Sequence, residues 1–361
     1  MNSIYIIYGA TFFFILLLAR FGFARHYILA KNYNLVKGYN SRAAHKGVVY
    51  TGAGLIIAFM LMLVAVVLNN VEFLYFETLS TIIGTSVLVS VIGLYDDFQD
   101  MSAFHKYTVL GFLIAMTVYS GQTPEGDLGI ITNLNGFFGI NEISYIAGFF
   151  FTCFVYLSVI NAINLMDGID GYMSIFSIMF FSIFFLMYEI NAYYTHSVVA
   201  VVFIASMFVF LKHNFSRKQK LFVGDAGSLF IGFWIAYFLI LYITSSDIGN
   251  LVNLFSIQIE NVPVLAVATI NIPVLDTLRV MVVRILQKKS PFSADRNHVH
   301  HILIDKKISH LRTSLILCLI NLVNLLIIFL LESYVNSYEL TALYVGINLF
   351  WLGFFEYLRH R

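Results

Sequence analysis

Apolar runs of about 20 residues recur along the whole chain of 361 residues, and they constrain its fold more than any other feature. A helix rises about 1.5 Å per residue, so roughly 20 apolar residues cross the hydrocarbon of a bilayer. The runs predict eleven spanning helices, near residues 4–23, 52–68, 78–95, 106–120, 145–165, 172–190, 195–211, 229–245, 262–284, 313–332 and 338–356. The fourth run looks short and the ninth contains Pro263 and Pro273, so the count can shift by one. We therefore expect one all-α polytopic integral membrane domain over residues 1–361.

The composition excludes a soluble protein. Charged residues make up 11% of the chain and hydrophobic residues 60%, whereas a soluble domain carries about 25% charged residues. The net charge of +1 gives no strong field that would recruit a polyanion, so nucleic acid is not expected as a partner. The expected partner is the lipid bilayer. Cys153 and Cys318 lie in apolar runs and are interpreted as small hydrophobic side chains.

The lysines and arginines fall on one side of the predicted spans. All 21 of them lie in or beside alternate loops and at the C-terminus. The loops on the other side contain none, and they cover residues 69–77, 121–144, 191–194, 246–261 and 333–337. Because positive residues concentrate on the cytoplasmic side of membrane proteins, the N-terminus is predicted outside and the C-terminus in the cytoplasm. Most aspartates share the cytoplasmic side, which indicates a metal or phosphate site there.

The third span ends in the motif GLYDDFQD at residues 93–100. Its adjacent carboxylates, Asp96 and Asp97, repel one another and lie at the negative end of the helix dipole. A cation would remove both objections, and Lys106 follows nearby in the sequence. The alternative is that the pair forms only a polar end to a membrane helix.

The fifth and sixth spans are joined by NAINLMDGIDG at residues 161–171. Asn161, Asn164 and Asp167 share one helix face because each follows the last by three residues. The glycines let the backbone turn tightly and approach a ligand, and an asparagine deep in an apolar helix is costly without a partner. A tight helical hairpin with polar caps is the alternative, although a hairpin needs only a glycine or two.

The eighth span opens with FVGDAGS at residues 222–228. Small residues at a helix start expose backbone N–H groups, which favour an anion. Asp225 could hold a metal that bridges to that anion. Taken alone, the motif also fits an ordinary helix N-cap.

The ninth loop carries SPFSADRNHVHH at residues 290–301, in which Arg296 precedes His298, His300 and His301. Zinc binding is not favoured, because the HExxH spacing is absent and no cysteine is near. Histidines beside an arginine favour phosphate oxygens as ligands.

The first loop ends in HKGVVYTGAG at residues 45–54. Lys46 and the glycines after it suit a nucleotide phosphate at a helix start. Glycine is also common where membrane helices pack closely, so this motif is weak by itself.

Together, the motifs at 93–100, 161–171, 222–228 and 290–301 resemble those of the polyprenyl-phosphate N-acetylhexosamine-1-phosphate transferases, a family of the glycosyltransferase family 4 type. The resemblance is closest to the WecA-like branch, and it runs from about Arg42 to His301. One motif departs from the family, which has a proline and a Gly-Gly pair where this chain has Tyr50 and Ala53-Gly54.

The resemblance implies a reaction in the bacterial inner (cytoplasmic) membrane. Undecaprenyl phosphate would attack the β-phosphate of a UDP-N-acetylhexosamine, releasing UMP and starting an O-antigen, common-antigen or teichoic-acid chain. The implied cofactor is Mg²⁺, with Mn²⁺ as the alternative, and its implied ligands are Asp225 and Asn164. The implied catalytic residues are Asp96, Asp97, Lys106, His298, His300 and His301. The implied substrate-binding residues are Asn161, Asp167, Asp170, Lys46 and Arg296.

Two other functions compete with this one. A transporter would also place polar residues in membrane helices, but some of its carboxylates should lie near the midplane rather than at one face. An inactive assembly subunit would not need this set of polar motifs. The sequence leaves open which N-acetylhexosamine is used and whether the chain forms a homodimer.

Overall fold

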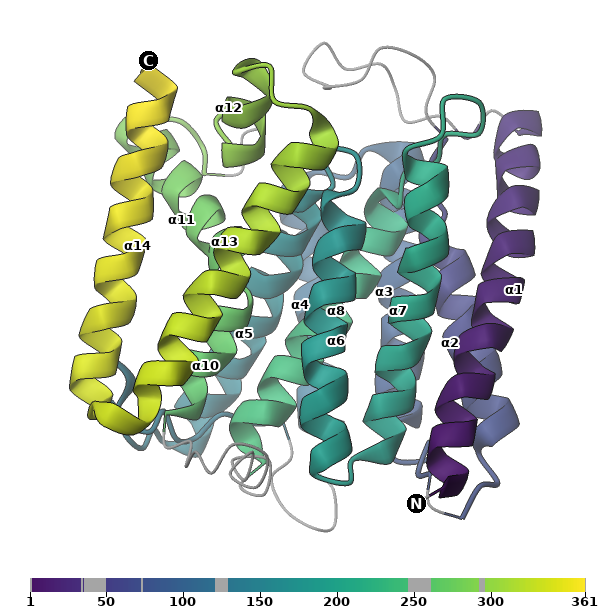
Figure 1. Cartoon of the computed structure of the whole chain (residues 1–361), viewed down its shortest axis with the longest axis horizontal. Helices are drawn as coiled ribbons and strands as arrows, with labels where there is room; N and C mark the ends of the chain where they lie inside the picture. Colours follow the sequence, from purple (N-terminus) through teal and green to yellow (C-terminus); the bar gives the residue numbers. More distant parts are fainter. Residues whose placement is uncertain are drawn as a thin grey trace.

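The computed structural model describes residues 2–33, 35, 50–72, 74–120, 129–245, 261–291 and 296–360 as a bundle of helices (Figure 1). The long helices are α1 (Asn2–Asn32), α2 (Gly54–Leu68), α3 (Ser80–Gln99), α4 (Ala103–Ser120), α5 (Tyr145–Met166), α6 (Tyr172–Ile190), α7 (Tyr194–Asn214), α8 (Gly224–Thr244), α10 (Val262–Thr269), α11 (Asn271–Leu286), α13 (His310–Leu331) and α14 (Ser337–His360). The short ones are η1 (Phe137–Gly139), α12 (Val299–Asp305) and η3 (Glu332–Tyr334). Over the described residues, β-pairing is limited to two isolated bridges, so the all-α prediction is confirmed.

Each of the eleven predicted ranges falls on a helix or, for the ninth, on a pair of helices. Among the described residues, eight helices are long and apolar enough to cross a bilayer, or nine if the bent pair α10 and α11 is one span. Helix α2 has only 15 residues. The chain is thus a polytopic membrane protein, while the count of eleven stays a prediction.

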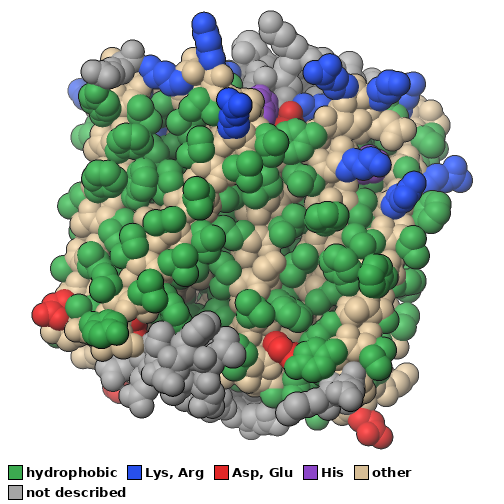
Figure 2. Space-filling view, viewed as in Figure 1, with side chains coloured by type: hydrophobic (Ala, Val, Ile, Leu, Met, Phe, Trp, Pro, Cys, Tyr) green, Lys and Arg blue, Asp and Glu red, His purple; other side chains and the backbone are tan. Residues whose placement is uncertain are grey.

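Charge is distributed unevenly over the surface. Lysine and arginine side chains gather at one end of the face shown in Figure 2, above a broad band of hydrophobic side chains. The two termini lie at opposite ends of the bundle, as an odd number of crossings requires (Figure 1). The predicted orientation in the membrane agrees with this polarity and remains a prediction.

The ninth predicted span is not one straight helix. Helices α10 and α11 meet at an angle of 79°. Asn321 of α13 bridges the break, because its Oδ1 accepts a hydrogen bond from the Ile272 amide at 2.9 Å and its Nδ2 donates to the Thr269 carbonyl at 2.7 Å. A broken membrane helix needs such partners, since no water can satisfy the freed backbone groups. The predicted span over 262–284 is therefore a broken helix, at the run whose prolines made its count uncertain.

Helix α8 lies at the centre of the bundle, and nearly all its residues are buried. Helices α2, α3 and α5 pack against it. Small residues allow the close approach: a Cβ on Gly54 would clash with the backbone of Gly227, and one on Gly93 with the carbonyl of Asp225. Close backbone contact of this kind fixes the start of α8 against the end of α3.

We expect Gly93→Ala to disturb this contact. The added methyl group meets backbone that cannot swing aside, and overpacking of this kind costs about 1–3 kcal/mol. The melting temperature of the detergent-purified protein should fall. Gly84→Ala on the same helix is the matched control, because nothing lies within 4 Å of its Cβ position. Equal melting temperatures for the two variants would contradict the close packing.

Candidate active site

The carboxylate of Asp97, at the end of α3, caps the start of α8. Its Oδ1 accepts a hydrogen bond from the Asp225 amide at 3.0 Å, and its Oδ2 accepts one from the Ala226 amide at 3.3 Å. The positive end of the α8 dipole therefore offsets the unfavourable end of α3. The sequence predicted a cation for this purpose, whereas the structure uses the amides of a neighbouring helix for Asp97.

Lys106, at the start of α4, joins two acidic motifs. Its Nζ lies 2.7 Å from Asp96 Oδ2 and 2.6 Å from Asp225 Oδ2, and the residue is buried. The other Asp96 oxygen accepts a hydrogen bond from the Met101 amide at 2.7 Å. One ammonium group thus serves two carboxylates, and with Asp97 close by the cluster keeps a net negative charge that suits a further cation.

The end of α5 also reaches the start of α8. Asp167 Oδ2 accepts a hydrogen bond from the Gly224 amide at 3.2 Å, directly before Asp225. One turn and two turns earlier on that face lie Asn164 and Asn161. The Tyr107 hydroxyl, next to Lys106, donates to Asn161 Oδ1. The three motifs predicted to act together therefore converge on the first turn of α8.

Asp170 lies in a neighbouring polar contact of its own. Its Oδ2 is 2.7 Å from Lys220 Nζ and 3.4 Å from His310 Nδ1. Ser314 Oγ also donates to its backbone carbonyl at 3.1 Å. The predicted nucleotide contact of Asp170 would thus share its carboxylate with a lysine, which the sequence did not single out.

The histidine motif packs against the second motif. The rings of His298 and His300 stack with centroids 5.6 Å apart. A Cβ on Gly168 would clash with the His300 ring, so this glycine lets the imidazole approach the DGIDG turn. A small pocket lies here, lined by Ala162, Leu165, Met166, Tyr172, Ile272, Pro273, Asp276, Thr277, His298, Val299, His300 and Leu317.

The two basic residues predicted to bind substrate are Arg296 and Lys46, and only Arg296 lies among the described residues. Arg296 pairs at 2.8 Å with the exposed carboxylate of Asp305, at the end of α12. It lies near enough to His301 to affect its titration. Lys46 lies outside the described residues, so its predicted phosphate contact stays a prediction.

The sequence did not single out several residues that lie beside the predicted site residues. Lys220 and His310 come from distant segments, and no spacing pattern links them to Asp170. Asp276 and Arg279 had a usable signal: both are charged and buried within the predicted ninth span. Ionisable residues inside a membrane helix are costly and indicate a functional site by default.

The imidazole of His301 should make stability depend on pH. Burial, with Arg296 nearby, lowers the pKa of His301 to about 4, while an unfolded histidine has a pKa near 6.5. The unfolded chain therefore binds the proton first, and stability should fall as pH drops from about 6.5 to about 4. His301→Gln should reduce this fall in melting temperature, whereas substitution of the exposed His105 should not. An unchanged profile in His301→Gln would contradict a buried, neutral imidazole.

The side-chain oxygens around the start of α8 suit a magnesium ion that is also bound by substrate better than a metal bound by side chains alone. Among the described residues, no group of three or more His, Cys, Asp or Glu side chains is placed to hold a metal ion. The carboxylates of Asp96, Asp97, Asp167 and Asp225 offer only oxygen. Mg²⁺ binds through one or two carboxylates, waters and substrate phosphates, so this donor set suits an ion that comes with a diphosphate.

A family model described as glycosyl transferase family 4 matches residues 79–243. That stretch holds the Asp96-Asp97 pair, the 161–171 motif and Asp225, which the fold brings together at α8. Over this stretch, which is just under half of its length, the chain is similar to glycosyl transferase family 4. This agrees with the resemblance found in the motifs.

Curated relatives carry related names. The chain is 30% identical to a probable undecaprenyl-phosphate N-acetylglucosaminyl 1-phosphate transferase of Bacillus subtilis, over 69% of this chain and 65% of the relative. It is 27% identical to undecaprenyl-phosphate alpha-N-acetylglucosaminyl 1-phosphate transferase of Escherichia coli K12, over 76% and 71%. It is 29% identical to a decaprenyl-phosphate N-acetylglucosaminephosphotransferase of Mycobacterium leprae, over 68% and 63%. The chain thus covers less than two thirds of the first and third relatives.

Proposed function

We propose that this chain transfers N-acetylhexosamine 1-phosphate from a UDP-sugar to a polyprenyl phosphate such as undecaprenyl phosphate, releasing UMP. The observation that carries the proposal is Lys106 between Asp96 and Asp225, at a helix start whose amides are held by Asp97. The ammonium group can neutralise phosphate charge, and the carboxylates around it can hold a cation that accompanies a diphosphate. The names of the family relatives support the same reaction class.

The reaction forms one bond and breaks one. An oxygen of the lipid phosphate attacks the β-phosphorus of the UDP-sugar, and the bond from that phosphorus to the bridging oxygen breaks. UMP leaves with the electron pair. A phosphomonoester has a second pKa near 6, so the attacking phosphate is mostly dianionic at pH 7 and needs no base to remove a proton.

This leaves Asp97 with a positioning role. Both of its oxygens already accept hydrogen bonds from the amides of Asp225 and Ala226, so its carboxylate orients the start of α8. Lys106 would neutralise phosphate charge, and Asp225 with Asn164 would hold Mg²⁺. When bound, the ion would stabilise the charge that develops on departing UMP. Placement and electrostatics then supply most of the catalysis, as in other phosphoryl transfers.

The remaining substrate contacts follow the positions of the motifs. Asn161, Asp167 and Asp170 would line the nucleotide side, and the three histidines with Arg296 would hold the sugar diphosphate. The sugar proposed first is N-acetylglucosamine, because the relatives are named for it. The product would start a cell-surface polysaccharide at the bacterial inner membrane.

The experiment is UMP release by the purified protein with undecaprenyl phosphate and a panel of UDP-N-acetyl sugars. We expect UMP release only when lipid phosphate is present, and we expect it to be fastest with UDP-N-acetylglucosamine. A transporter would instead move a solute across vesicles without releasing UMP. Among the described residues, Asp96, Asp97 and Asp225 lie together where α3 ends and α8 begins, which favours a site at one face of the membrane over a path through it.

Removal of divalent metal should stop the reaction. EDTA is expected to lower UMP release by at least about 100-fold, because the charge of two phosphates would lose its main counter-ion. Added Mg²⁺ should restore the rate, and Mn²⁺ should restore part of it. A rate that is unaffected by EDTA would contradict the role proposed for Asp225 and Asn164.

A further inference from the structure

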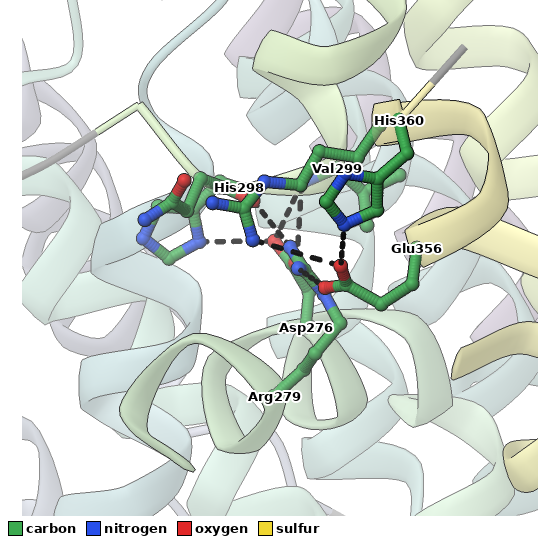
Figure 3. Close-up of polar contacts among 8 residues, drawn as sticks. Asp276, Arg279, His298, Val299, Glu356 and His360 are labelled. Carbon is green, nitrogen blue, oxygen red and sulfur yellow. Dashed lines mark hydrogen bonds and ion pairs between the residues drawn. The ribbon is translucent and has the colours of Figure 1, made fainter. Parts of the chain in front are cut away.

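A second buried network of charges lies on α11. It joins Asp276 and Arg279 of α11 to His298 and to Glu356 of the C-terminal helix α14 (Figure 3). Asp276, Arg279 and His298 are all buried. Charges buried in a membrane helix are costly, so a network of this kind needs a reason.

Asp276 is the centre of the network. Its Oδ2 lies 2.9 Å from His298 Nδ1, and its Oδ1 lies 2.8 Å from the Arg279 guanidinium. The amide of Val299 donates to the same carboxylate, at 3.1 and 3.2 Å from its two oxygens. The carboxylate therefore holds both the ring of His298 and the first amide of α12.

This contact decides which ring nitrogen of His298 is available to a ligand. A carboxylate accepts hydrogen bonds, so the Nδ1 atom that faces Asp276 carries a hydrogen. The ring atom left for another partner is Nε2, and the ring cannot turn without breaking the contact. The stacked ring of His300 and the pocket between α5 and α11 lie beside it.

Arg279 fixes the carboxylate from the other side. Its Nη1 donates to Glu356 Oε1 at 2.9 Å. Its Nη2, which contacts Asp276, also donates to the backbone carbonyl of Asn297, directly before His298. Figure 3 shows Arg279 between Asp276 and Glu356. The loop that ends in His298 is thus tied to α11 and α14 together.

We propose that Asp276 is a positioning residue of the transfer reaction, which orients His298 Nε2 toward the diphosphate of the UDP-sugar. Arg279 keeps the Asp276 carboxylate in place, and it carries the link to α14. This inference rests on the proposed function, because it takes His298 as a contact of the sugar diphosphate.

The test is a double-mutant cycle with Asp276→Asn and His298→Asn, read as kcat and KM for the UDP-sugar. Asparagine at 276 keeps the shape and removes the charge, and asparagine at 298 keeps a donor in place of Nδ1 but removes Nε2. Each single variant should lower kcat/KM by about 10- to 100-fold, mainly through KM. The double variant should be little worse than either single one, since Asp276 acts through His298.

The controls separate positioning from folding. Asp276→Glu keeps the charge and should retain more activity than Asp276→Asn, with both variants melting close to wild type. If Asp276→Asn melts early, Asp276→Glu in the His298→Asn background supplies the cycle. Glu339→Gln, an exposed acid at the other end of α14, is the matched control and should behave as wild type.

Two results would overturn the inference. One is a wild-type KM in both Asp276 variants, and the other is a double variant whose losses multiply. Either result in a preparation whose wild type releases UMP leaves the proposed function standing. Absence of UMP release by the wild type would contradict the proposed function itself.

Discussion

Asp97→Ala should reduce UMP release by about 1,000-fold while the protein still folds. The substitution removes the carboxylate that holds the amides of Asp225 and Ala226, so the start of α8 is no longer fixed against α3. Misplacement of reacting groups by about 1 Å can cost about 100-fold, and the start of α8 that would shift also carries Asp225, the proposed Mg²⁺ ligand. Loss of a helix cap also lowers the free energy of unfolding by about 0.5–2 kcal/mol.

The measurement is UMP release together with thermal melting in detergent. Asp100→Asn is the matched control, because Asp100 is an exposed residue of the same motif and has a left-handed backbone that asparagine tolerates. It should keep near-normal activity. An Asp97→Ala protein with activity similar to that of Asp100→Asn would remove Asp97 from the site.

The second large effect is expected for Lys106→Met, which should lose about 1,000-fold in turnover. Without the ammonium group, the carboxylates of Asp96 and Asp225 repel one another, and the phosphates lose a positive partner. Breaking a buried ion pair from one side costs about 3–5 kcal/mol, so the melting temperature should fall as well.

Lys106→Arg separates the two effects. It keeps the charge, but its flat guanidinium cannot replace a compact ammonium between two carboxylates. We expect it to recover much of the stability and little of the turnover. Lys212→Met, at an exposed position at the end of α7, should match wild type in both assays. Wild-type turnover in Lys106→Met would contradict the electrostatic role of this residue.

The sequence predicted the helical class and the meeting of three motifs, for a physical reason. Apolar runs have a length set by the bilayer, and lysine and arginine mark one side, so residues 93–100, 161–171 and 222–228 were expected at one face. The start of α8 then brings Asp97, Asp167 and Lys106 together. The shared membrane face of these motifs could be predicted because local sequence patterns indicate where each span begins and ends.

Tertiary partners could not be predicted in this way. A cation was expected beside the Asp96-Asp97 pair, but the sequence did not indicate that Lys106 would serve Asp96 and Asp225 while helix amides serve Asp97. The partners of Asp170 come from two other segments of the chain. The break between α10 and α11 depends on Asn321, some 50 positions further on. Such contacts arise from packing, which no spacing pattern encodes.

The most direct test of the central claim follows the phosphorus of the UDP-sugar. UDP-N-acetylglucosamine labelled at the β-phosphate and, separately, at the α-phosphate is incubated with the purified protein and undecaprenyl phosphate. The β-label should enter the lipid product together with the sugar, and the α-label should leave as UMP. Label from the α-phosphate in the lipid, or UMP released without any lipid product, would contradict transfer of a sugar 1-phosphate by this chain.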